Sequence, residues 1–473
     1  MSTVSPPATS SVTGTFRPRV QRDLIVDDLG EHVILLHPTQ ARWALTNRTG
    51  LQLAQWMDGS RTAADVAEEL TASYEGLTGE VALADVETFT RQLDEAHMLE
   101  NGSAQQRTQA ALQDPANRPR KEPPSMTIYI TEQCNLRCKH CAIVEGKMPE
   151  TTLTAEDIQD LIIQHTTNYD NPTVSFLGGE PFLREDCIEL LEFARRHTRQ
   201  LTISTNGLLL DDAAAARLAK IDGLDFQVSL DGADPEVHDF LRGKGGFAKT
   251  WAAIELLCRH GMAPNLTVAT TLTRCSLPQV DKLVEDTSRL GIRTLRFLNL
   301  NKMRAAVTNW DRIAPEPEEL QRVFRHLIFE VVPRQKGRRP EVKAGFPGFA
   351  PDLNPEQEPW CPLGKTLIVD SQGQTYNCPI LNTPEHRIGD IRRNSLSEME
   401  NGEKNRALRQ RMLSRRYTIP ECAACAWRNF CQAGCQASMQ LRSGSMFVTD
   451  EFCEFRRNLY REHVLRQGLG SGG

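Results

Sequence analysis

The stretch that decides the fold is MTIYITEQCNLRCKHC, residues 126–141, in which an apolar run leads into three cysteines. The run MTIYIT has the length and composition of a buried β-strand. Cys134, Cys138 and Cys141 follow it with the spacing C-x3-C-x2-C. Three thiolates can bind three irons of a [4Fe–4S] cluster, which leaves the fourth iron without a protein ligand. The alternatives are a loop of free thiols and a structural zinc site, which requires four closed ligands, usually as paired C-x2-C units.

Five more apolar runs follow, and amphipathic segments such as AEDIQDLIIQHT separate them. Six strand–helix units with apolar strands predict a parallel sheet covered by helices, an α/β fold closed into a partial (β/α)6 barrel of the TIM type. In such a barrel, active residues lie just after the carboxyl ends of the strands, as the three cysteines do. The predicted strands are 126–131, 173–177, 201–205, 225–230, 265–272 and 294–300.

Short polar motifs follow the second, third and fourth of these strands. Each motif alone would indicate only a turn or a helix start, but their common order on consecutive strands argues against coincidence. The motifs are Gly178-Gly179-Glu180, Thr205-Asn206-Gly207 and Ser229-Leu230-Asp231-Gly232, with His238-Asp239 and Arg242-Gly243 completing the last.

Together with the cysteines, this series resembles the radical S-adenosylmethionine (SAM) superfamily. The resemblance implies that SAM chelates the open iron, and that electron transfer from the reduced cluster produces a 5′-deoxyadenosyl radical, which takes hydrogen from the substrate. The sequence FLNLNKM near the end of the sixth strand departs from the more usual Gly/Pro-containing pattern. The implied SAM contacts are Gly178, Gly179 and Glu180 for the amino group, Ser229 and Arg242 for the carboxylate, and Leu298 for the adenine, with Thr205, Asn206 and Asp231 in the same site.

Seven more cysteines lie in the last quarter of the chain. Seven thiolates are too many to close one cluster and one too few to close two. A zinc ribbon built from Cys422, Cys425, Cys431 and Cys435 would leave the other three cysteines without a role. Their spacing is Cys361…Gly373-x4-Cys378…Cys422-x2-Cys425-x5-Cys431-x3-Cys435…Cys453.

This spacing resembles the SPASM extension of peptide- and protein-modifying radical SAM enzymes. The resemblance implies two auxiliary [4Fe–4S] clusters with interleaved ligands, which could relay electrons or contact the substrate. Some relatives have an additional cysteine shortly after the first, but the matching stretch PLGKTLIVD has none. Of the two auxiliary clusters, the one nearer to the SAM-binding cluster therefore has an open iron or a non-cysteine ligand. By this resemblance Cys422, Cys425, Cys431 and Cys453 close the distal cluster, and Cys361, Cys378 and Cys435 hold the nearer one.

The sequence pattern of residues 16–102 predicts a small, winged-helix-like α+β domain. Strands are expected at 33–37 and 42–46, and two helices capped by Asn47 and Thr62 follow them. A third helix is expected over 83–99. The pattern, including WMDGSRTAADVAEEL, resembles the PqqD-like recognition element of ribosomal peptide (RiPP) biosynthesis, which has three strands and three helices.

That resemblance implies that a leader peptide adds as a strand beside residues 41–47. Val86, Arg91 and Leu93 would line the groove. A generic winged-helix domain for dimerisation or nucleic-acid binding is the alternative, which the absence of a marked basic bias weakens.

Composition supports a globular protein without a membrane or nucleic-acid partner. The net charge is −6 over 473 residues, no apolar run reaches the roughly 18 residues of a membrane helix, and the N-terminus lacks a signal-peptide core. The cytoplasm is therefore expected, where thirteen cysteines indicate metal sites and not disulfides. The remaining segments are predicted as disordered ends (1–15 and 466–473), a linker (103–124), the radical SAM core (125–310), a helical bridge (311–357) and the SPASM domain (358–465).

We therefore predict a radical SAM maturase that binds a precursor peptide by its leader. It would form a thioether or carbon–carbon crosslink, or a related oxidation, in the core peptide. SAM and three [4Fe–4S] clusters are the expected cofactors, with a flavodoxin or ferredoxin as electron donor. The alternatives are a radical SAM enzyme that modifies a folded protein or small molecule, and a non-catalytic iron–sulfur or zinc adaptor. No general base stands out among Glu132, Asn299 and Asn301.

Overall fold

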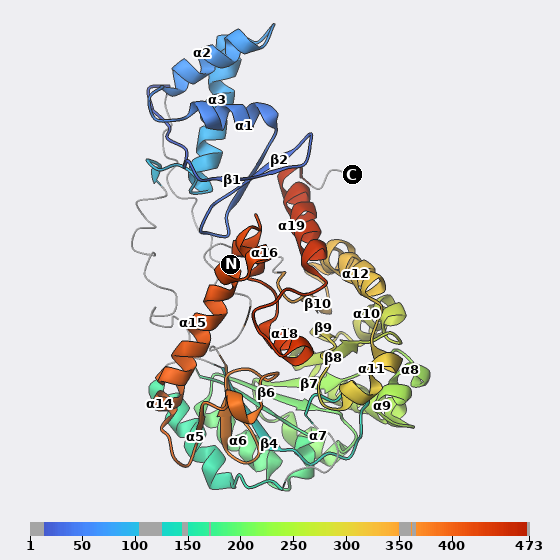
Figure 1. Ribbon diagram of the computed structural model, residues 1–473. Coiled ribbons are helices and arrows are strands. Elements are labelled where there is room, and N and C mark those ends of the chain that lie inside the picture. Colours follow the sequence, from blue (N-terminus) through green and yellow to red (C-terminus); the bar gives the residue numbers. More distant parts are fainter. Residues whose placement is uncertain are drawn as a thin grey trace.

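The computed structural model describes residues 14–103, 125–143, 150–169, 172–349, 361 and 366–470. A small N-terminal domain lies at one end, a large helix-covered sheet at the other, and the cysteine-rich C-terminal elements between them (Figure 1). Nearly all of the predicted N-terminal disorder and of the predicted linker lies outside the described residues. None of the described helices is both long and apolar enough to cross a membrane.

All six predicted barrel strands are present, and each pairs in parallel with the next along the chain. This confirms the predicted α/β architecture. The strands are β4 (Ser125–Thr131), β5 (Thr173–Gly178), β6 (Gln200–Thr205), β7 (Leu224–Ser229), β8 (Leu266–Leu272) and β9 (Thr294–Asn299). The helices between and after them are α5 (Ala155–Asn168), α6 (Cys187–His197), α7 (Asp212–Leu218), α8 (Pro235–Arg242), α9 (Gly246–Arg259) and α10 (Val280–Arg289).

Side chains on these strands alternate between an apolar outer face and a polar inner face. Leu201 and Ile203 of β6 are fully buried in the core shared with the helices, whereas Thr202 between them is only partly buried. On β9, Leu295 and Phe297 are buried on the same outer face. The outer face holds the barrel together by excluding water, so the polar inner face is left to line a substrate cavity.

The sheet extends beyond the six predicted strands at both edges. β10 (Glu341–Ala344) pairs in parallel with β9, and β11 (Thr366–Val369) pairs in parallel with β4 and leads into β12 (Gln374–Tyr376) and β13 (Gly389–Asp390). The segment predicted as a helical bridge over 311–357 therefore also contains a strand that the prediction missed. That region does contain α12 (Pro317–His326), a π-helical turn (Leu327–Val331) and α13 (Val332–Gln335), preceded by α11 (Ala305–Ile313). The strand EVKA has too few apolar residues to be visible before its pairing with β9 is known.

The N-terminal domain has the three strands and three helices that the resemblance implied. β1 (Ile25–Asp28), β2 (Val33–Leu36) and β3 (Trp43–Thr46) form an antiparallel sheet, followed by α1 (Arg48–Trp56), α2 (Ala63–Ser73) and α3 (Gly79–Glu95). The predicted caps are confirmed, because the Asn47 side chain accepts from Gly50 N–H and Thr62 forms a capping box with Asp65. Val86 and Leu93 are fully buried in the domain core, so their predicted place in a groove is wrong.

The C-terminal region consists of short helices and one long one. They are α14 (Leu396–Asn401), α15 (Glu403–Thr418), α16 (Pro420–Ala423), α17 (Arg428–Cys431), α18 (Gln436–Ser443) and α19 (Cys453–Gly468). α19 reaches the N-terminal domain (Figure 1), and its Gly468 packs against Leu45 of β3. The predicted disorder from residue 466 is therefore wrong for Arg466–Gly468, which this packing keeps helical.

Asp27 fastens the N-terminal domain to the cysteine-rich region. Trp427 Nε1 donates to Asp27 Oδ2 at 2.8 Å, and Arg461 binds both carboxylate oxygens at 2.8 and 2.7 Å. Burial alone would raise the pKa of Asp27, but the hydrogen bonds from Arg461 and Trp427 lower it overall. Trp427 stacks on Tyr460, with ring centroids 5.3 Å apart. The segment between Cys425 and Cys431, which contains Trp427, is therefore in direct contact with the N-terminal domain.

We expect Asp27→Asn to loosen this attachment. The substitution leaves Arg461 without a carboxylate, and losing hydrogen bonds to a charged group costs about 1.5–3 kcal/mol. Thermal denaturation and limited proteolysis should show earlier release of residues 14–103. Asp28→Asn is the control, because Asp28 pairs with Arg48 only at the exposed surface, at 3.5 Å. Equal losses in the two variants would contradict the assignment.

Candidate active site

The three cysteines of the first motif lie together in the loop after β4. Burial raises the pKa of the Cys138 thiol to about 12, and the neighbouring thiols of Cys141 and Cys134 add to this rise. Cys134 Sγ accepts a hydrogen bond from Leu136 N–H at 3.4 Å. Three half-buried thiols that destabilise one another's ionised forms in one loop are a donor set suited to positively charged iron.

Gly178 and Gly179 bring the end of β5 directly against the segment that enters the cysteine loop. A Cβ on Gly178 would lie 1.9 Å from the Thr131 carbonyl oxygen, and one on Gly179 would lie 2.2 Å from that of Gln133. Gly179 N–H donates to Thr131 O at 2.9 Å. Any side chain at either position would force the two segments apart, so the motif requires both glycines.

Glu180 connects the loop after β5 to the loop after β6. It has no exposed surface. Its carboxylate accepts from Thr205 Oγ1 at 2.6 Å and from Asn206 N–H at 2.8 Å. Asn206 Nδ2 in turn donates to Asn135 Oδ1 in the cysteine loop at 2.8 Å. Burial raises the pKa of Glu180 despite these donors. Both of its oxygens therefore position the Thr205-Asn206 turn against the cysteines.

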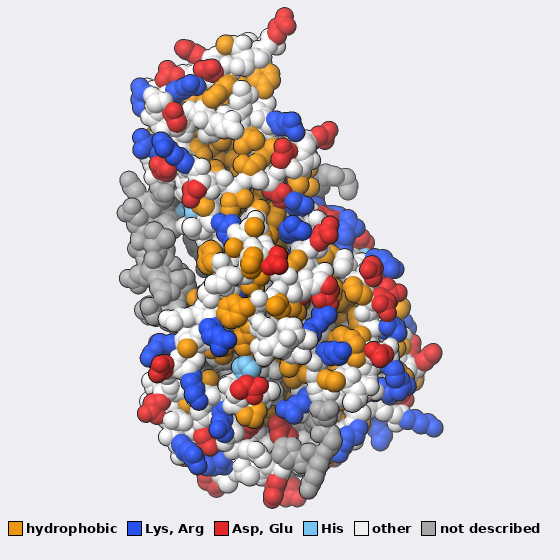
Figure 2. Space-filling model, in the orientation of Figure 1, with side chains coloured by type: hydrophobic (Ala, Val, Ile, Leu, Met, Phe, Trp, Pro, Cys, Tyr) orange, Lys and Arg blue, Asp and Glu red, His pale blue; other side chains and the backbone are white. Residues whose placement is uncertain are grey.

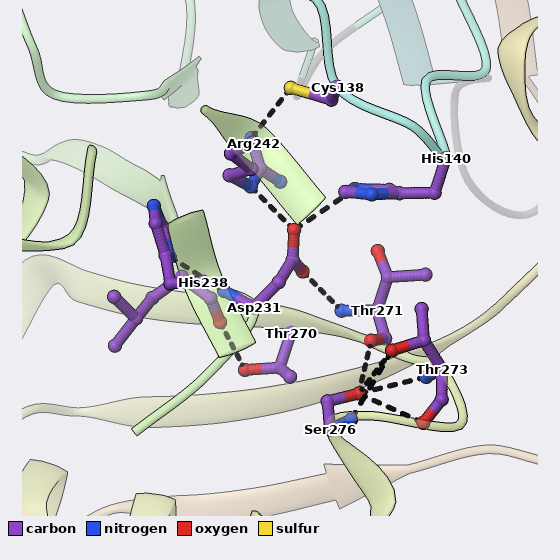
Figure 3. Close-up of polar contacts among 10 residues, drawn as sticks. Cys138, His140, Asp231, His238, Arg242, Thr270, Thr271, Thr273 and Ser276 are labelled. Atoms are coloured by element: carbon purple, nitrogen blue, oxygen red, sulfur yellow. Dashed lines mark hydrogen bonds and ion pairs between the residues drawn. The ribbon is translucent and has the colours of Figure 1, made fainter. Parts of the chain in front are cut away.

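Asp231, just after β7, is the centre of a charged network around the cysteine loop (Figure 3). Its Oδ2 lies 3.0 Å from His140 Nε2 and 2.5 Å from Arg242 Nε, and its Oδ1 accepts from Thr271 N–H at 2.7 Å. Arg242 Nη1 lies 3.9 Å from Cys138 Sγ. Burial alone would raise the pKa of Asp231, but Arg242 and His140 hold it well below its usual range. The carboxylate is thus ionised and ties β7, β8 and α8 to the cysteines.

Two histidines complete this network, and the sequence singled out only one of them. His140 lies between Cys138 and Cys141, and nothing in its spacing revealed its contact with Asp231. His238, from the predicted His238-Asp239 pair, accepts from Asp231 N–H through Nδ1 at 3.3 Å (Figure 3). Burial lowers the pKa of His238 to about 4, so the ring is neutral at pH 7. A neutral imidazole can accept this hydrogen bond, whereas an imidazolium could not.

The other predicted cofactor positions lie at the carboxyl ends of their strands. Ser229 ends β7, and Leu298 stands one residue before the end of β9. Both are partly exposed on the inner face, and Leu298 lines a cavity of about 820 Å³. The structure therefore brings the motif residues after β5, β6 and β7 around the cysteine loop, with Leu298 on the cavity wall.

Several polar residues at the mouth of the barrel, where the carboxyl ends of the strands lie, have no assigned role but have defined contacts. Glu132 accepts from Ser371 Oγ at 3.0 Å, and burial raises its pKa. Asn299 Nδ2 donates to Gly345 O at 2.8 Å, and Asn301 Nδ2 donates to Asn299 O at 3.4 Å. Cys275, which follows β8, is partly exposed within electrostatic reach of Lys139. None of these contacts singles out a general base.

The seven later cysteines fall into two spatial sets. Burial raises the pKa of Cys378 to about 12, and Cys435 and Cys361 contribute to that rise. Burial raises the pKa of Cys422 to about 12 as well, with contributions from Cys431, Cys453 and Cys425. Cys378 and Cys435 each also accept two backbone N–H bonds, a geometry that suits thiolates. The two groups have the same members as the two ligand sets that the resemblance to the SPASM extension implied.

Arg415 of α15 lies between the two sets. It is 1% exposed, and its guanidinium donates only to backbone carbonyls, those of Met446 at 2.5 Å, Gly434 at 3.0 Å and Ala433 at 2.9 Å. Burial lowers the pKa of Arg415, whereas the nearby cysteines raise it. A buried cation with no carboxylate partner among the described residues fits two sets of metal-bound, anionic thiolates.

Among the described residues, no group of three or more His, Cys, Asp or Glu side chains could hold a metal ion. A [4Fe–4S] cube places its cysteines on separate irons, so the assignment of clusters rests on the cysteine spacing and on the grouping described above.

Three family models match the chain in the order of its domains. They are "Coenzyme PQQ synthesis protein D (PqqD)" over residues 32–99, "Radical SAM superfamily" over 128–286 and "Iron-sulfur cluster-binding domain" (SPASM) over 361–426.

Known proteins are similar over most of the chain. The mycofactocin maturase MftC of Mycolicibacterium smegmatis is 30% identical over 329 residues, which cover 67% of this chain and 79% of that protein. An AdoMet-dependent heme synthase of Oleidesulfovibrio alaskensis is 26% identical over 69% of this chain and 86% of that protein. The crystal structure of Streptococcus suis SuiB bound to precursor peptide SuiA shares the fold, with a TM-score of 0.58 and 16% identity over 92% of this chain and all of that chain. The chain belongs to the radical SAM superfamily, as an enzyme with a PqqD-like domain and a SPASM domain that uses SAM and several [4Fe–4S] clusters.

Proposed function

We propose that this enzyme is a precursor-peptide maturase that oxidises the core peptide inside the barrel, by forming a thioether or carbon–carbon crosslink or by a related oxidation. The observation that carries the proposal is a PqqD-like domain fastened through Asp27 to the SPASM region of a radical SAM barrel. The maturase MftC, which is 30% identical, and the SuiB structure with its precursor peptide support it.

The leader would bind at the free edge of β3. His37 N–H donates to Arg42 O at 3.0 Å, and outward and inward backbone groups alternate along an antiparallel strand. The backbone N–H and C=O groups of Arg42 and Ala44 therefore point toward β2, whereas those of Trp43 and Leu45 point outward from the sheet edge. Gln92 Nε2 of α3 already donates to Leu45 O at 3.2 Å. An added strand would thus pair mainly with the Trp43 backbone, alongside α3.

Each cysteine set would hold one cluster. Cys134, Cys138 and Cys141 would bind the catalytic one, the set around Cys422 the distal auxiliary one, and the set around Cys378 the nearer one. When bound, SAM and the reduced catalytic cluster supply a 5′-deoxyadenosyl radical. The protein's own residues orient these bound groups and shield the radical. Asp231 and Glu180 fix the loops around the cysteines, while Ser229 and Leu298 face the space where SAM would lie.

An acidic redox protein, a flavodoxin or a ferredoxin, would supply the electrons. On the visible face of the barrel, Lys and Arg are interspersed with Asp and Glu (Figure 2). That face therefore lacks the single-sign field that favours nucleic acid.

Apolar side chains gather on the visible face of the N-terminal domain (Figure 2), as an edge that receives a peptide requires.

The second candidate is a radical SAM enzyme that acts on a small molecule or folded protein, which the similarity to an AdoMet-dependent heme synthase favours. Such an enzyme has no need of a peptide-binding edge. The two candidates therefore differ in whether β3 matters for turnover.

We expect Trp43→Pro in the full-length chain to weaken leader binding at least tenfold, because proline removes the outward N–H. The readouts are leader affinity by fluorescence anisotropy and conversion of the precursor peptide, which is to be sought among the genes beside this one. Val26→Pro is the matched control, because the same alternation turns Val26 N–H outward on the opposite edge, where the Val26 side chain is 44% exposed. Wild-type affinity in Trp43→Pro, or equal loss in Val26→Pro, would reject the proposed edge.

A further inference from the structure

The inner wall of the barrel contains an arginine whose surroundings the function described so far does not explain. Arg296 lies between Leu295 and Phe297 of β9, which are 0% and 2% exposed and face the helices. Arg296 therefore points to the opposite, inner face, as Leu298 does. At about 3.3 Å per residue, it lies roughly 7 Å further from the mouth than Leu298.

Arg296 lines the cavity of about 820 Å³ together with residues from four other strands. Thr202 of β6, Gln227 of β7, Thr267 of β8 and Lys343 of β10 contribute to the same wall. The hydroxyl and amide groups on this wall suit a polar guest, but they cannot neutralise a charge.

The charges in this cavity do not balance. Its lining holds three cations, Arg293, Arg296 and Lys343, and two carboxylates, Asp225 and Glu341. Arg293 Nη1 lies 2.7 Å from Asp225 Oδ1, and Lys343 Nζ lies 3.4 Å from Glu341 Oε2. Within the described part of the chain, the side chain of Arg296 forms no hydrogen bond or ion pair. Three cations less two carboxylates leave one positive charge, which belongs to Arg296.

The Arg296 side chain is exposed to this cavity, so a bound anion can reach its guanidinium. A guanidinium presents several N–H donors in one plane, which match the two oxygens of a carboxylate. SAM carries a carboxylate, but its predicted partners, Ser229 and Arg242, lie at the carboxyl end of β7 and on α8.

We propose that Arg296 binds a carboxylate of the substrate peptide and so fixes how far the core peptide enters the barrel. The proposal rests on the proposed function, because it requires a peptide in the cavity. The carboxylate can be an Asp or Glu side chain of the core peptide or the C-terminus of the precursor. Both sources would be held by the same paired N–H···O contacts.

The test uses the reconstituted full-length enzyme and a precursor peptide identified among the neighbouring genes by its binding to this enzyme. Three kinds of peptide are compared: the natural one, one with an amidated C-terminus, and a series with single Asp→Asn or Glu→Gln changes in the core. We expect one of these replacements to raise the KM of the wild-type enzyme at least tenfold. In Arg296→Gln the natural peptide should already show this higher KM, and the same replacement should change it less than twofold. Arg296→Lys should recover part of the affinity.

The control is the double variant Glu192→Gln/Arg217→Gln, which removes an ion pair between α6 and α7, with 2.8 Å between Arg217 Nε and Glu192 Oε1, outside the cavity lining and without changing the net charge. Its KM should stay within twofold of the wild type. If Arg296→Gln binds the natural peptide as the wild type does, or if the peptide replacement has the same effect in both enzymes, the subsite is rejected. If the wild type cleaves SAM but modifies no peptide, the proposed function fails, and the subsite fails with it.

Discussion

Replacing Cys134, Cys138 and Cys141 together with alanine is expected to abolish SAM cleavage. These thiols are the donors placed between β4 and the Asp231 network, and without them the catalytic cluster has no ligands. Reconstituted wild-type protein should hold about twelve irons, as three cubes require, and the triple variant about eight. Anaerobic assays for 5′-deoxyadenosine and iron analysis provide the two measurements.

Cys187→Ala is the control for this triple variant. Cys187 is 1% exposed in the helix-facing core and belongs to none of the three sets. The Cys187→Ala variant should lose some stability from core packing but no iron. Continued formation of 5′-deoxyadenosine by the triple variant, or zinc in place of iron in the wild type, would contradict the assignment.

Asp231→Asn is expected to destabilise the barrel core by about 3–5 kcal/mol, because it leaves the buried Arg242 without its carboxylate. The loop that carries His140 and Cys138 would lose its anchor, so SAM cleavage should also fall. Since Arg242 and His140 keep the folded-state pKa of Asp231 below the unfolded value of 3.8, the wild type retains this stabilisation above about pH 4 and loses it only in stronger acid. The deficit should therefore be constant between about pH 6 and 8.

Denaturant unfolding of the apoprotein measures this effect at the transition assigned to the barrel. Glu316→Gln is the control, because Glu316 pairs with Arg274 at 2.7 Å with both side chains largely exposed, and such pairs contribute at most about 1 kcal/mol. A loss in Asp231→Asn no larger than in this control would show that the buried carboxylate does not anchor the loop.

The sequence by itself determined the elements whose signals are local. The six barrel strands follow from apolar runs, and the caps at Asn47 and Thr62 from side chains that accept N–H bonds three residues ahead. The grouping of the seven later cysteines followed from their spacing and its family resemblance. The structure brings the same sets together.

Only the tertiary structure decided features that depend on partners distant in the chain. β10 is a strand because β9 offers it an edge, and α19 continues to Gly468 because β3 covers its end. Val86 and Leu93 belong to the domain core and not to a groove because helix packing decides which side of α3 is buried. His140, Asp231 and Arg242 meet across about a hundred residues because a buried carboxylate must find N–H donors wherever the fold brings them. Periodicity along a chain reports which face is apolar, but pairing of buried charges and strand edges is settled only when the chain has folded.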